Sequence, residues 1–203
     1  MDGINTSLAL RLIPLAQDLG DSDLITRLLD HASIVAEDEI ERGWARFEGM
    51  KMLNSSINTM LILAEEAETT DEGSPLAAAI HHHVALLHMS EGSYDEARAI
   101  GTRSLRLRER LQDLNGMAYG LALLMMIAKK QQDFDTAIAL GTERLELANK
   151  LGKPMVQMEA IAELAHCHHG GHICPCAGLV RTVRFIRLVY AKKLTVVRIF
   201  SGF

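Results

Sequence analysis

The residues with the clearest chemical potential are histidines and cysteines, and they gather in two clusters. The first is the consecutive run His81-His82-His83. The second lies between Cys167 and Cys176. Imidazole and thiolate are good zinc ligands, and four of them can close a tetrahedral structural site. The second cluster therefore predicts a zinc site with the ligands Cys167, His169 or His172, Cys174 and Cys176.

The spacing of both clusters argues against a metal. Consecutive residues of a helix point about 100° apart, so His81, His82 and His83 cannot all bind one ion. His88 is two helical turns beyond His81, which is too far to complete a compact metal site. The run is therefore expected on a partly exposed helix surface. In the second cluster no C-x₂-C pair occurs, and all the ligands fall within ten residues. Structural zinc sites join two separated ligand pairs, so the alternative is that these cysteines bind no metal.

Catalytic motifs are not found in the sequence. It contains no G-x-S-x-G, P-loop, H-E-x-x-H or G-x-G-x-x-G. Cys167 has a histidine beside it, but neighbouring residues of a helix do not face each other, which such a catalytic pair requires. We predict that the protein is not an enzyme and uses no cofactor.

The elements that must position these residues come from a repeated segment. Tyr94-Asp-Glu-Ala97-Arg-Ala99-Ile-Gly101-Thr102 returns 40 residues later as Phe134-Asp-Thr-Ala137-Ile-Ala139-Leu-Gly141-Thr142. The leucines repeat with the same spacing: Leu105, Leu107 and Leu111 return as Leu145, Leu147 and Leu151. A fixed period in this range is typical of repeat arrays.

Composition favours helices and a reducing compartment. Of the 203 residues, 48% are hydrophobic and only 4% aromatic, and unbranched Ala, Leu and Met lose little side-chain freedom in a helix. No apolar run is long enough for a spanning helix, and the first residues do not read as a signal peptide. The three cysteines lie close together, so a dispersed disulfide framework is excluded. These features predict an all-α protein of the cytoplasm.

Apolar periodicity and turn residues divide the chain into helices. A helix over 6–20 is expected to start or kink at Pro14, and a helix beginning at Ser22 or Asp23 follows. An acidic stretch at 37–41 and Asn54-Ser-Ser interrupt the next apolar stripe. Later helices are predicted at 75–90, 94–114, 117–130, 134–151 and 154–168. The repeat array then spans 1–169, with a partial unit at 6–20, units at about 21–69, 75–114 and 115–152, and an incomplete unit at 154–169.

The last segment, residues 170–203, differs in charge from the rest of the chain. Residues 1–169 hold 15 basic and 26 acidic residues, whereas 170–203 hold six basic residues and no acidic one. Three interpretations remain open for this basic, apolar tail. It could bind anionic lipid or nucleic acid, it could cap the array, or it could have no evolved role.

The repeats resemble the tetratricopeptide family. Tyr94 and Phe134 match the family's aromatic position before the second helix of each unit, and Ala97 and Ala137 match its small-residue position. Gly92 occupies the turn glycine. The period is similar to that of long tetratricopeptide arrays in MalT-type bacterial regulators. The resemblance implies a right-handed superhelix of antiparallel helical hairpins.

The resemblance also implies a protein-binding groove lined by the first helices of the units. The positions carried over are Ala79, His82, Leu86, Met89, Tyr119, Ala122, Met126, Lys129, Lys130, Glu159, Ala162, His166 and His169. We expect Tyr119 and Met126 to carry recognition, with Lys129 and Lys130 binding acidic groups. The alternatives are that Met125 and Met126 belong to the core, and that the two lysines only complement a helix C-terminus.

The function that follows is a protein-interaction scaffold for a peptide or partner domain, within a larger signalling or regulatory protein. Nucleic acid is not expected on the array, and membrane binding would involve only the tail. Two alternatives stay open. One is a ligand-responsive sensor segment of a MalT-like transcription regulator, and the other is a zinc-binding or lipid-binding role of residues 167–203.

Overall fold

The fold consists of helices joined by short turns. The computed structural model describes residues 4–70, 72 and 74–168, and within them every regular element is an α-helix. The helices are α1 (Thr6–Asp18), α2 (Ser22–Val35), α3 (Glu39–Met52), α4 (Ile57–Glu68), α5 (Ser74–Glu91), α6 (Tyr94–Arg110), α7 (Leu114–Lys130), α8 (Phe134–Lys150) and α9 (Pro154–His168). The predicted all-α class is confirmed for this part of the chain.

In most of the turns between helices, the chain reverses at a residue whose backbone has the left-handed conformation. The residues with positive φ are Gly20, Asn54, Gly92, Gln112, Gln132 and Gly152. Glycine adopts this conformation without steric cost, which is why it commonly follows a helix. Gly92 has φ 84° and Gln132, 40 residues later, has φ 60°. Glutamine thus adopts the conformation of the turn glycine that it replaces in the second repeat.

Side chains at the helix starts accept hydrogen bonds from the open amides of the first turn. Asp21, rather than Ser22 or Asp23, caps α2 by accepting from the Leu24 amide at 2.9 Å. Asp133 caps α8 in the same way, accepting from the Thr136 amide at 3.1 Å. These caps place the helix starts directly after the tight turns.

Residues 21–69 hold three helices, α2, α3 and α4, where one two-helix unit would have two. The predicted interruptions do separate them, since Asp38 caps α3 and Ser56 caps α4. Helix α1 continues through Pro14. It packs against both α2 and α3, as α5 packs against both α6 and α7. The division of the chain into repeat units stays a prediction.

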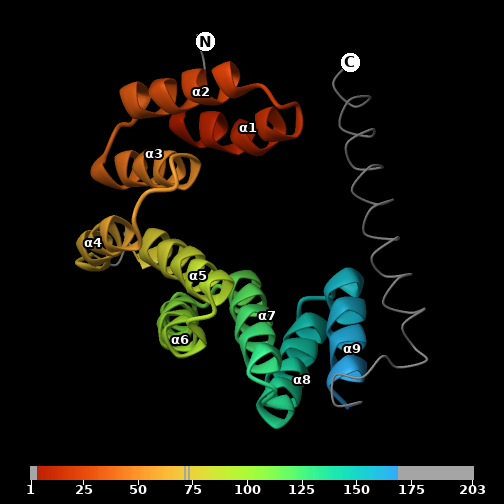
Figure 1. Ribbon diagram of the computed structural model, residues 1–203. Coiled ribbons are helices and arrows are strands. Elements are labelled where there is room, and N and C mark those ends of the chain that lie inside the picture. Colours follow the sequence, from red (N-terminus) through yellow and green to blue (C-terminus); the bar gives the residue numbers. More distant parts are fainter. Residues whose placement is uncertain (1–3, 71, 73, 169–203) are drawn as a thin grey trace, which may run out of the picture.

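The helices pack in chain order into a curved array (Figure 1). Helices α1 and α2 lie at one end and α9 at the other, and consecutive helices pack side by side from α1 to α9. Within the described ranges no helix has both the length and the apolar character to cross a bilayer. The array is therefore an all-α helical repeat solenoid, in which each hairpin buries its apolar face against its neighbours.

Two small residues occupy equivalent buried positions in the successive hairpins. Ala97 of α6 and Ala137 of α8 are both fully buried, at 0% exposure. Ala97 belongs to one apolar cluster with Ala85 of α5, and Ala137 belongs to another with Met125 of α7. Close approach of paired helices at a small side chain is thus repeated after 40 residues, as the sequence pattern predicted.

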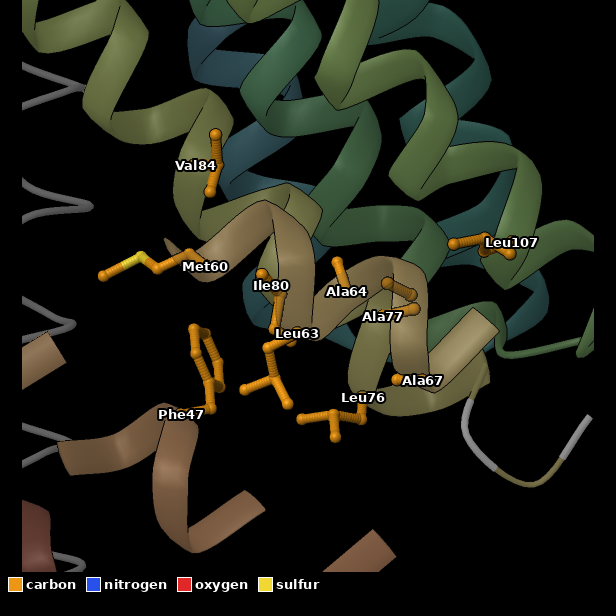
Figure 2. Packing of buried hydrophobic residues seen from close by; sticks show 11 residues of the cluster. Phe47, Met60, Leu63, Ala64, Ala67, Leu76, Ala77, Ile80, Val84 and Leu107 are labelled. Atoms are coloured by element: carbon orange, nitrogen blue, oxygen red, sulfur yellow. The ribbon is translucent and has the colours of Figure 1, made fainter. Parts of the chain in front are cut away.

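The core is a chain of clusters and not one central mass. Figure 2 shows the cluster where α3, α4, α5 and α6 meet. Phe47 reaches from α3 toward Met60 and Leu63 of α4, and Leu107 of α6 belongs to the same cluster. Phe47 lies close to Trp44, with their ring centroids 6.4 Å apart. Each cluster joins a short run of consecutive helices, which is the arrangement expected of a repeat array.

Candidate functional site

Helix α7 presents the most accessible of the residues expected to line a binding groove. Tyr119 is 66% exposed and Met126 is 40% exposed, although both are large and apolar. Met125, the neighbour of Met126, is only 2% exposed and packs in the core. Lys130 is exposed at the end of the helix. The tyrosine and the methionine therefore leave apolar surface open on one helix.

The corresponding residues of α5 and α9 are less accessible. Leu86 is half-buried and packs against the cluster that contains Ala85. His166 is half-buried as well, and Ala162 is buried at 4% exposure. His169 lies outside the described residues. The open part of the predicted face is consequently concentrated on α7.

Tyr119 borders a hollow of about 210 Å³ between α7 and α9, which we call the Tyr119 hollow. The hollow lies where α7 and α9 begin, beside the turn that joins α8 to α9. It combines apolar walls with charged side chains, as small binding pockets do. Its lining residues are Asn115, Ala118, Tyr119, Arg144, Leu151, Lys153, Met155, Val156 and Glu159.

A buried ion pair lies beside Tyr119 in this hollow. The Arg144 guanidinium of α8 donates to Glu159 of α9 at 2.9 Å, and its side chain is only 8% exposed. The Nε atom of Arg144 is buried and has no hydrogen-bond partner. In the preceding repeat the same position is Ser104, which donates to the Ala78 carbonyl at 2.7 Å. The 40-residue alignment could have identified Arg144, since a buried polar position recurs there, but the groove pattern assigned no role to second helices.

Lys129 is already paired within the array. Its ammonium group donates to the Glu163 carboxylate of α9, and its side chain is 20% exposed. A partner's acidic group would have to compete with Glu163 for this cation. Lys130 is the more accessible of the two predicted lysines.

His81 is buried, so the predicted partly exposed surface is wrong for this residue. It is 1% exposed, and neither ring nitrogen has a hydrogen-bond partner. Its Nε2 atom lies 3.7 Å from Glu68 of α4, and that carboxylate is in turn ion-paired with Arg103 of α6. Burial lowers the pKa of His81, and the nearby charge of Arg103 acts in the same direction.

The other two histidines of the run face different neighbours. Burial lowers the pKa of His82 to about 4, with the Arg108 charge adding to the effect. His83 lies edge-on to Phe47 of α3 with ring centroids 5.8 Å apart, and burial lowers its pKa too. The three side chains therefore diverge, as their spacing predicted, and cannot share one metal ion.

A second cavity lies at the α3–α4 turn and had not been predicted. It has a volume of about 530 Å³, and Lys51, His83 and Glu91 lie among its polar walls. Its remaining lining residues are Asn54, Ser55, Ser56, Ile57, Asn58, Met60, Leu87 and His88. The sequence signal was the break at Asn54-Ser-Ser, which revealed a turn but not the helix lying opposite.

Cys167, the first residue of the predicted zinc site, lies in the core. It is 1% exposed and packs with Met125, Ala128 and Ala137. Burial raises the pKa of its thiol, which disfavours the thiolate that a metal requires. Among the described residues no cluster of three or more metal-ligating side chains occurs. The other predicted ligands, His172, Cys174 and Cys176, lie outside them.

Comparison with known proteins identifies the type of fold and no family. No known family profile matches the chain, and no curated protein matches it. Among solved structures, it is similar to a crystal structure of a putative kinesin light chain from Podospora anserina with nearly identical TPR-like repeats. The TM-score is 0.55 at 14% sequence identity, over 92% of this chain and 94% of that one. The likeness supports a TPR-like repeat fold.

Proposed function

We propose that the protein is an interaction scaffold that binds a peptide or a partner domain across α5, α7 and α9. The observation that carries this proposal is the open apolar surface of Tyr119 and Met126 beside the Tyr119 hollow. Tyrosine supplies a large contact area at low entropic cost, and methionine adapts to varied partners. The repeat fold supports the proposal, because stacked hairpins form extended binding surfaces.

Each residue of the proposed surface has a distinct part. Tyr119 is the anchor, because its ring is accessible and borders a hollow into which a partner side chain can fit. Met126 continues the apolar contact about two helical turns further along α7. Lys130 supplies an accessible cation for an acidic group, while His82, Leu86 and His166 form the shallower flanks. None of these groups is arranged as a nucleophile with its base, so the proposal is binding without catalysis.

The wider setting is also part of the proposal. We place the array in a larger signalling or regulatory protein of the cytoplasm, where the free buried thiol of Cys167 would stay reduced. A sensor segment of a MalT-like regulator is the variant of this idea that the 40-residue period favours. An ATPase or helix-turn-helix domain in the full-length gene would distinguish that variant from a simple scaffold.

The test is an affinity measurement on an identified partner. Proteins retained by the full chain would be identified by mass spectrometry, and the leading partner purified. Its affinity would then be measured for the parent chain and for Tyr119→Ala, Met126→Ala and Lys130→Ala. Because aromatic anchors carry much of the binding energy in protein interfaces, Tyr119→Ala should weaken binding by about 30-fold or more.

Matched controls come from the outer surface of α6 and α8. Arg106→Ala and Glu146→Ala remove exposed side chains from second helices and should change the affinity by less than about two-fold. If all three α7 variants bind as tightly as the parent chain, the proposed surface is not the binding site.

A further inference from the structure

The histidine run occupies positions that the next repeat fills with apolar residues. His81-His82-His83 of α5 align with Leu121-Ala122-Leu123 of α7 after 40 residues. Leu121 is 0% exposed and Leu123 is 1% exposed, and His81 is buried to the same degree at 1%. The packing of this fold therefore accepts Leu-Ala-Leu at these positions. Three titratable side chains here are a property of this hairpin and not a requirement of the repeat.

Each histidine faces charged groups from the helices that pack on α5. His81 lies against α4, where Glu68 is 3.7 Å away and Glu65 contributes a weaker charge, and against Arg103 of α6. The Arg103–Glu68 ion pair holds the carboxylate, so the His81 ring has no hydrogen-bond partner. Adding a proton to His81 would place a second cation near Arg103 on a side chain that is itself only 1% exposed.

His82 and His83 are placed similarly against α6 and α3. The Nδ1 atom of His82 is buried without a partner, and the cation facing it is Arg108. Arg108 is fixed there because it donates to the Gly116 carbonyl at 2.6 Å, and the charge of Asp113 also acts on it. His83 faces Lys51 and Glu48 of α3, which are themselves paired at 2.7 Å. Each histidine thus has a cation nearby, from α6 or from α3.

We propose that the His81-His82-His83 run makes α5 an acid-sensitive seam, at which protonation loosens the packing of α3, α4 and α6 while α7, α8 and α9 keep theirs. His88 is not part of this run, because it lies more than a helical turn beyond His83, where Glu91 of the same helix is 3.9 Å from its ring. The inference is independent of the proposed partner-binding function, since it concerns the stability of one region of the array.

The direction of the pH effect follows from linkage. The pKa values of all three histidines are lowered in the folded chain, and that of His82 is about 4, against about 6.5 in an unfolded chain. Between these values the unfolded chain binds more protons, so stability is complete above about pH 6.5 and is lost as the pH falls. His82 alone should reduce the folding equilibrium constant roughly 30-fold between pH 7.5 and pH 5.0.

The decisive experiment replaces the three histidines of α5 by the residues found at the equivalent positions of α7. Urea unfolding of the full chain and of the triple variant His81→Leu, His82→Ala, His83→Leu would be followed from pH 7.5 to pH 5.0. The parent chain should lose stability by roughly 30-fold or more in its folding equilibrium constant, and the triple variant by less than about five-fold. Equal losses in both proteins would overturn the proposal.

Hydrogen exchange measured by mass spectrometry locates the effect. At pH 5.0, after correction for intrinsic exchange rates, amides of α3, α4, α5 and α6 should exchange faster relative to pH 7.5, with α7, α8 and α9 unchanged. Uniform acceleration along the array would contradict a local seam. His166→Gln is the matched control on α9 and should retain the pH dependence of the parent chain. If the triple variant does not fold, His82→Ala, which copies Ala122, must still reduce the pH dependence roughly 30-fold.

Discussion

Gly141 of α8 lies so close to Leu164 of α9 that a methyl group added at the glycine would approach the leucine Cδ2 atom to 2.8 Å. The same relationship holds one repeat earlier, where a methyl at Gly101 would lie 3.1 Å from Cδ2 of Leu124. The second helix of each hairpin therefore contacts the first helix of the next one through a glycine. This contact joins successive hairpins, so larger side chains there should separate them.

We expect Gly141→Leu to destabilise the array by about 1–3 kcal/mol, because an overpacked core forces its neighbours out of their favoured conformations. Met125 would be displaced along with Leu164, since its Cε atom is 2.9 Å from the same added methyl. Gly49→Leu in α3 is the control, because nothing lies within 4 Å of a methyl group at that glycine. Urea unfolding of both variants would measure the difference, and equal stability would mean that the α8–α9 contact is not tight.

Ala97→Leu and Ala137→Leu should each cost about 1–3 kcal/mol for a similar reason, because both alanines are fully buried between paired helices. Ala99→Leu and Ala139→Leu are the matched controls, since they lie two residues further along the same helices and are exposed. Thermal unfolding would show a lower melting temperature for the buried pair alone. A buried variant as stable as its exposed control would show that its hairpin is not closely packed.

Arg144→Ser should destabilise the chain by about 3 kcal/mol, because it leaves the partly buried Glu159 carboxylate without this cation. The double variant Arg144→Ser, Glu159→Ala removes both charges and should recover most of that loss, since Ser104 already fills the position of Arg144 in the preceding repeat. A double-mutant cycle by urea unfolding measures the coupling between the two residues. Additive effects would mean that the ion pair contributes nothing specific.

Cys167 should react slowly with iodoacetamide in the folded chain, because its thiol is buried and its pKa is raised. Peptide mass spectrometry after timed labelling at pH 8 would follow Cys167 separately from Cys174 and Cys176. Unfolding in urea should bring its rate up by at least about 100-fold, since reaction requires exposure of the thiolate. Metal analysis of untagged protein belongs beside this measurement, and a zinc content near zero would end the zinc hypothesis.

The sequence by itself determined the helices and their repetition. Turn glycines and caps are local signals, because they depend on residues close together in the chain, and the 40-residue period can be seen by comparing the sequence with itself. The small residues Ala97 and Ala137 also predicted where paired helices meet, since each one matches the small-residue position of the family within its own hairpin. The groove residues followed only partly. Tyr119 and Met126 are exposed, but Ala162 is buried, and helical spacing alone does not give the depth of burial.

Only the tertiary structure decided which polar residues share an environment. The helical spacing predicted that His81 would lie on a partly exposed surface. In the structure α4 and α6 enclose it, and they place Glu68 and Arg103 near its ring. Arg144 meets Glu159 on the next helix, and Lys129 meets Glu163 two helices further along the chain. Periodicity specifies which face of a helix is apolar, but the depth of burial and the charges opposite that face depend on how the hairpins stack.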